Sequence, residues 1–96
     1  MTTVTLSKAA RSDLLQILRY SAKEWGADRA VRYVEALHDT FENLAAFPHL
    51  GTDVGHLRRG YFRITSGSHM VYFRKAETGV FIVRILHQSR RPETQI

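Results

Sequence analysis

The fold is decided by the stretch from Leu57 to His87, which reads LRRGYFRITSGSHMVYFRKAETGVFIVRILH. Apolar and polar residues alternate along most of it, which is the period of a β-strand with one buried face. Short runs containing glycine interrupt the alternation twice, so the stretch predicts three strands, over 57–65, 69–75 and 80–87. The last strand is apolar on both faces, which is typical of a central strand. The stretch therefore predicts an antiparallel meander with residues 80–87 inside the sheet.

The residues before this stretch have the period of an α-helix. Small or apolar side chains recur at helical spacing over 10–25 and again over 30–45, so each segment predicts a helix with one buried stripe. Ser7 and Asp28 occupy the positions expected of N-caps, and Gly26 ends the first helix. Because a link of only two or three residues joins them, the two helices are expected to form an antiparallel hairpin.

Together these elements predict an α+β fold of order β-α-α-β-β-β. A short strand over 2–6 precedes the helices, and the segment 47–55, which contains Pro48 and Gly51, is the long loop. We expect the N-terminal strand and the helical hairpin to pack on the antiparallel sheet, with residues 1–96 forming a single domain. Residues 88–96 have no apolar periodicity, so they are expected to form a flexible C-terminal tail.

The composition excludes several classes of protein. The chain has no cysteine, so disulfides and thiolate metal sites cannot contribute, which agrees with a reducing compartment. It contains no apolar stretch long enough to cross a bilayer and no N-terminal signal segment. The sequence therefore predicts a cytoplasmic protein without a membrane partner.

The positive charge of the chain is concentrated in its C-terminal part. Residues 1–56 hold six Lys and Arg against seven Asp and Glu, whereas residues 57–96 hold eight against two. Most of these cations are arginines, whose guanidinium groups suit carboxylates and phosphates. An acidic partner is therefore expected, although a small domain also needs net charge for solubility.

The chain lacks the familiar catalytic and cofactor motifs. Its five histidines do not have the spacing of a metal site, and no cofactor or metal is expected. His69 begins one predicted strand and His87 ends the next, and such positions are neighbours in an antiparallel pair. The pair is compatible with acid–base chemistry, but strand-end histidines more often serve only as hydrogen-bonding caps.

A set of short motifs, spread over nearly the whole chain, resembles a known family. Its members are Leu6-Ser7, Ala10, Asp13-Leu14, Tyr20, Trp25-Gly26, Leu44-Ala45, Pro48, Gly51, Leu57-Arg58, Gly60-Tyr61, Gly67-Ser68-His69, Tyr72-Phe73-Arg74 and Arg84-Ile85-Leu86-His87-Gln88. In this order and length they resemble the ParE branch of the RelE/ParE toxin superfamily. No single motif is decisive, and the combination carries the resemblance.

The resemblance implies a type II toxin that a ParD-like antitoxin neutralises. ParE-like toxins are associated with inhibition of DNA gyrase, which they trap on cleaved DNA, whereas RelE-like relatives cut messenger RNA in the ribosomal A site, so the fold alone does not separate the two activities. The sequence departs from the RNase pattern at Met70, where those relatives often carry an arginine, and in the tail, which lacks their tyrosine. Only Arg63, Arg84 and His87 remain to promote cleavage. The resemblance therefore favours a binding toxin over an enzyme, with a ribosome-dependent mRNA endonuclease as the alternative.

A third hypothesis is a nucleic-acid-binding module without toxicity. Tyr61, Phe62, Tyr72 and Phe73 could stack on bases, but strand alternation sends about half of them into the core. Direct nucleic-acid binding is therefore not expected. The residues expected to contact the target or the antitoxin are Arg58, Arg59, Arg63, His69, Arg74, Arg84, His87, Arg90 and Arg91.

Overall fold

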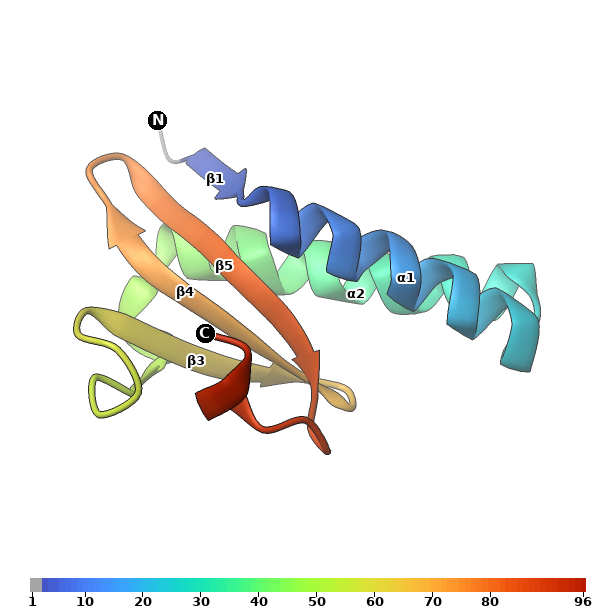
Figure 1. Cartoon of the computed structure of the whole chain (residues 1–96). Coiled ribbons are helices and arrows are strands. Elements are labelled where there is room, and N and C mark those ends of the chain that lie inside the picture. Colours follow the sequence, from blue (N-terminus) through green and yellow to red (C-terminus); the bar gives the residue numbers. More distant parts are fainter. Residues whose placement is uncertain (1–2) are drawn as a thin grey trace.

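Two helices cover one face of a five-stranded sheet in the computed structural model, which describes residues 3–96 (Figure 1). The predicted α+β class is confirmed, and residue 2 of the predicted first strand lies outside the described residues. The elements in chain order are β1 (Thr3–Leu6), α1 (Lys8–Trp25), α2 (Ala27–Ala46), the 3₁₀ helix η1 (Pro48–Leu50), β2 (Thr52–Asp53), β3 (Tyr61–Ser66), β4 (His69–Ala76), β5 (Gly79–His87) and the 3₁₀ helix η2 (Pro92–Thr94).

The strands lie in the order β1-β5-β4-β3-β2. The predicted meander is confirmed, because β3, β4 and β5 pair antiparallel, and the prediction that β5 is internal is also confirmed. β1 pairs with β5 in parallel, so the sheet is mixed rather than purely antiparallel. A bulge occurs where Tyr72 and Phe73 pair with Arg84 and Ile82, which leaves Val83 as an extra residue in β5.

The helical hairpin begins at a side-chain cap. The Ser7 hydroxyl accepts a hydrogen bond from the Ala10 N–H (2.9 Å) and donates one to the Val83 carbonyl (2.6 Å), so it ties the start of α1 to β5. The link to α2 is the single residue Gly26, whose φ of +89° favours glycine. The predicted cap at Asp28 is therefore wrong. This residue lies in the first turn of α2, where its negative charge interacts favourably with the positive end of the helix dipole.

Alternating residues of the sheet build two apolar clusters. The larger one lies between the sheet and the helices and contains Leu37, Phe41, Phe73 and Ile82, all nearly inaccessible to solvent. The smaller one contains Val54, Tyr72 and Leu86 together with the partly buried Ile96. Because Tyr72 and Leu86 alternate with helix-facing neighbours, this second cluster lies on the other face of the sheet, where Figure 1 shows the C-terminal segment.

The segment before the meander is more structured than the sequence predicts. The predicted strand over 57–65 begins only at Tyr61, because the preceding residues form turns in which the Leu57 N–H donates to the Val54 carbonyl (2.9 Å). The predicted loop 47–55 contains η1 and the two-residue strand β2, which pairs with β3. These short elements depend on contacts with the sheet rather than on a local pattern, so periodicity does not reveal them.

The C-terminal segment contacts the domain. Ile96 packs on the second cluster, and the Gln95 carbonyl accepts a hydrogen bond from Arg84 Nη1 (3.1 Å). These contacts tie the last two residues of the expected flexible tail to the domain. A single apolar residue at the end of a polar segment gives no periodic signal, although it is enough to dock the segment.

Candidate functional site

A groove of about 500 Å³ lies between α1 and the paired ends of β4 and β5. Ile17, Tyr20 and Trp25 of α1 line one side, and His69, His87 and Arg90 line the other. We call this cavity the histidine groove. It brings together three of the basic residues singled out in the sequence, one each from β4, β5 and the segment after β5.

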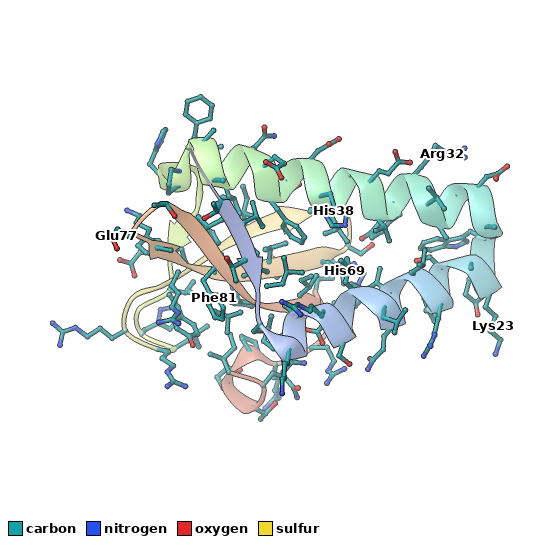
Figure 2. The ribbon with its side chains drawn as sticks, turned by 90° about the horizontal axis from the view of Figure 1, so that it is seen from above. Lys23, Arg32, His38, His69, Glu77 and Phe81 are labelled. Carbon is teal, nitrogen blue, oxygen red and sulfur yellow. The ribbon has the colours of Figure 1, made fainter. Side chains whose placement is uncertain are left out.

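The two histidines of the groove are neighbours, as their positions in the sequence predict. His69 stands opposite His87 in the register of β4 and β5. Their ring centroids lie 5.4 Å apart and the ring planes are nearly perpendicular, at 89°. In Figure 2, His69 lies near the middle of the molecule, between the sheet and the helices. The pair therefore extends from the rim of the groove, at His87, toward the interior of the domain, at His69.

Tyr33 of α2 positions His69. Its hydroxyl lies 2.7 Å from His69 Nδ1, accepts a hydrogen bond from the Ser68 N–H (2.9 Å) and lies 3.5 Å from the Ser66 carbonyl. The turn fits closely around this phenol, because a Cβ added at Gly67 would lie 2.6 Å from the hydroxyl. Sequence reasoning missed this residue. The available signal was its place one helical turn before the buried Leu37.

The hydrogen bonds of the phenol indicate the tautomer of His69. The phenol has one proton to donate, and its contact with Nδ1 is much shorter than its contact with the Ser66 carbonyl. We therefore assign the phenol as donor to Nδ1, which places the proton of the neutral ring on Nε2. Burial lowers the pKa of His69 below its ordinary value of 6.5, nearby His87 lowers it further, and Asp13 partly opposes both. His69 is therefore neutral at pH 7.

His87 is exposed at the rim of the groove. Its Nδ1 lies 2.8 Å from the Ser89 hydroxyl and accepts a hydrogen bond from the Ser89 N–H (3.2 Å). With Nδ1 as acceptor, the neutral ring carries its proton on Nε2 as well. Both imidazoles then offer an N–H donor, with the Arg90 guanidinium close by. The arrangement suits an anionic group better than a cation.

Arg84 lies beside the groove but is engaged by Asp13. Its Nε and Nη2 donate to the two carboxylate oxygens at 2.8 and 2.9 Å, and the Ile85 N–H donates to the same carboxylate at 2.9 Å. The hydrogen bond to Asp13 raises the pKa of Arg84, burial opposes this, and the attraction between the two charges adds to it. The pair links α1 to β5. Asp13 is among the motifs of the resemblance but was assigned no role from the sequence, although it is a charged residue within an apolar helical stripe.

The other arginines singled out in the sequence do not line the groove. Arg58 lies over the ring of Tyr61, with 5.7 Å from its Cζ to the ring centroid, and Arg74 lies over Phe81 at 4.7 Å. Because Arg74 pairs with Tyr61 in the sheet register, these two side chains lie at the end of the sheet away from His69. The structure places Arg59 in the loop before β3, Arg63 in the middle of β3 and Arg91 just before η2.

Neither a metal site nor a membrane span occurs in the part of the chain that the structure describes. No three His, Asp or Glu side chains gather where they could hold a metal ion within residues 3–96. Neither helix in that range is long and apolar enough to cross a membrane.

Comparison with known proteins identifies the class of this fold. The structure resembles a chain of the chromosomal ParDE TA system from P. aeruginosa, with a TM-score of 0.77 at 19% identity, covering 91% of this chain and 96% of that one. It also resembles a chain of the toxin–antitoxin complex RelBE2 from Mycobacterium tuberculosis, with a TM-score of 0.64 at 25% identity, covering 90% of this chain and 96% of that one. The fold is thus one that occurs in toxin–antitoxin systems.

Sequence comparison gives the family within this class. Residues 4–92 match the family described as the ParE toxin of the type II toxin–antitoxin system parDE. Toxin ParE1 of Caulobacter vibrioides is 43% identical over 84 residues, which cover 88% of this chain and 86% of the relative. The chain belongs to the ParE toxin family, as its motifs predict.

Proposed function

We propose that this chain inhibits DNA gyrase by binding it, without catalysing a reaction, and that a ParD-like antitoxin neutralises it in the cytoplasm. The observation that carries the proposal is the match to the ParE toxin family over nearly the whole chain, residues 4–92. Toxicity is the property that defines the family. We propose gyrase as the target because the chain resembles the ParE branch rather than the RelE branch.

The environment of the groove supports binding over catalysis. Cleavage of a phosphodiester needs a base for the 2′-hydroxyl and cations or hydrogen-bond donors for the negative charge that develops on the phosphate oxygens. Arg84 is held by Asp13 through two hydrogen bonds, so its guanidinium is committed within the domain. Met70, which stands where RNase relatives often have arginine, accepts a hydrogen bond from the Thr65 hydroxyl (3.2 Å). The groove itself then holds one guanidinium, that of Arg90.

An antitoxin partner is supported by the solved relatives and by charge. The structures that resemble this chain include a ParDE system and the RelBE2 toxin–antitoxin complex. Residues 57–96 carry eight Lys and Arg against two Asp and Glu, which suits an acidic segment. The residues that we propose to contact the antitoxin or the target are Arg58, Arg59, Arg63, His69, Arg74, His87, Arg90 and Arg91, whereas Arg84, the remaining residue expected from the sequence, is held by Asp13.

Expression of the chain alone in bacteria tests this proposal. We expect growth arrest, plasmid DNA that loses negative supercoils, and rescue when the protein encoded beside it is coexpressed. Cleavage of messenger RNA in a ribosome-dependent manner, with plasmid supercoiling unchanged, would contradict gyrase inhibition and support the endonuclease. Growth without arrest, at a high level of folded chain, would contradict toxicity.

A further inference from the structure

A continuous row of aromatic rings runs from α1 through α2 to the ends of β4 and β5. Neighbouring ring centroids are 6.4 Å apart for Tyr20 and Trp25, 6.1 Å for Trp25 and Tyr33, 5.6 Å for Tyr33 and His69, and 5.4 Å for His69 and His87. The outer members remain accessible, because Tyr20 is 62% exposed and Trp25 is 44% exposed. Exposed Trp and Tyr beside a groove are typical anchors of protein interfaces.

The polar groups of the groove favour an anion. Within residues 3–96, Nε2 of His69 and Nε2 of His87 make no hydrogen bond, and our tautomer assignment makes both of them donors. Arg90 adds a positive charge at the rim. Asp13 also lines the groove, but Arg84 and the Ile85 N–H occupy its carboxylate. The positive charge of Arg90 and the two imidazole donors therefore favour an anion over a cation in this groove, which the neutral side chains of Gln16, Ser21, Ser68 and Ser89 also line.

We propose that the histidine groove binds a segment of a protein partner in which a carboxylate side chain stands next to a large apolar side chain. The carboxylate accepts hydrogen bonds from His69, His87 and Arg90, and the apolar side chain packs against Ile17 and Trp25. This inference rests on the proposed function only in that the antitoxin is the protein expected to contain such a segment.

The distribution of cations favours a peptide over a nucleic acid. Nucleic-acid binding requires several cations that follow successive phosphates. Arg90 is the one guanidinium among the residues that line the groove, and Arg58 and Arg74 lie at the other end of the sheet. A single carboxylate with an apolar neighbour matches one cation, two N–H donors and an aromatic wall.

The chain carries its own probe for this site. Trp25 is its single tryptophan and lines the groove, so tryptophan fluorescence reports occupancy directly. The intact chain is titrated with acetyl-Leu-Glu-Phe-amide, with the uncharged analogue acetyl-Leu-Gln-Phe-amide and with inorganic phosphate. The ring nitrogens of His69 and His87 are followed in parallel by NMR.

We expect the acidic peptide to change the Trp25 fluorescence saturably and to shift both Nε2 resonances, with affinity about tenfold above that of the uncharged analogue. Arg90→Gln and His87→Leu should each lower the affinity by about fivefold or more. Lys23→Gln is the matched control, because it removes the same charge from an exposed position of α1 that does not line the groove, and the affinity should not change (Figure 2).

Several outcomes overturn the proposal. One is that the chain binds the two peptides with equal affinity, and another is that Arg90→Gln binds the acidic peptide as tightly as the wild type does. A third is that the Trp25 fluorescence shows no saturable change up to about 10 mM peptide. The last is that phosphate binds as tightly as the acidic peptide and competes with it. The titration needs no gyrase and no toxicity, so its failure is distinct from failure of the proposed function. If the chain binds the peptide but does not inhibit gyrase, the proposed role of the groove stands and the proposed target is wrong.

Discussion

Replacing Asp13 by Asn removes the charge that holds α1 to β5. The carboxylate accepts three hydrogen bonds, from Arg84 Nε (2.8 Å), Arg84 Nη2 (2.9 Å) and the Ile85 N–H (2.9 Å). All three partners are donors, so the amide nitrogen of asparagine would face a donor at one of them. Arg84 would then keep a partly buried guanidinium without its counter-charge.

The size of the effect follows from the burial of the pair. The Asp13 side chain is 10% exposed and that of Arg84 is 19% exposed. Breaking a fully buried pair costs about 3–5 kcal/mol, and the remaining solvation of Arg84 reduces this to roughly 2–4 kcal/mol. For a domain of this length, each kcal/mol lowers the Tm by about 4–8 °C, so we expect a fall of roughly 8–32 °C.

A double-mutant cycle isolates the pair. The free energy of unfolding is measured by urea denaturation for the wild type, Asp13→Asn, Arg84→Met and the double variant, with the exposed Arg32→Gln as a control that should change it by less than about 0.5 kcal/mol. The coupling energy between Asp13 and Arg84 should be roughly 1.5–3 kcal/mol. Effects that add to within about 0.5 kcal/mol, or an Asp13→Asn variant as stable as the wild type, would refute the reasoning.

Three further predictions concern packing and pH. Gly79→Ala should lower the free energy of unfolding by about 2 kcal/mol or more and speed amide exchange in β1, because a Cβ there would lie 1.8 Å from the Thr3 carbonyl oxygen; unchanged exchange would contradict this. His69 has a depressed folded pKa, so its contribution to stability should be complete above pH 6.5 and lost as the pH falls from 6.5 through the folded pKa. Urea midpoints from pH 5 to 8 check this, and a profile that His69→Gln leaves unaltered would count against it. Deleting residues 92–96 should cost roughly 1–2 kcal/mol in thermal unfolding, since Ile96 then leaves the second cluster, whereas an unchanged Tm would mean that the segment is not docked.

Local patterns in the sequence were sufficient for most of the fold. The helical stripes, the Ser7 cap and the period-two alternation of the meander depend on residues that are close in sequence, and the structure confirms them except at Trp25, the end of the first stripe, which is 44% exposed. The proximity of His69 and His87 followed from the same reasoning, because a short turn fixes which residues of two strands stand opposite each other.

The remaining features depend on contacts between distant residues. Asp13 meets Arg84 across 71 positions of sequence, and Tyr33 meets His69 across 36. Neither pair leaves a periodic signal. A charged residue in an apolar stripe and a tyrosine on the core side of a helix were visible, but their partners were not. The docking of Ile96 depends likewise on a cluster assembled from three separate segments.

The most direct test of the central claim is a supercoiling assay with purified gyrase, relaxed plasmid and ATP. We predict that the folded chain inhibits supercoiling in a concentration-dependent manner, that cleaved plasmid accumulates, and that the cognate antitoxin restores activity when added in equimolar amount. Gyrase that remains fully active in excess chain, while the same preparation cuts messenger RNA on ribosomes, would contradict the claim.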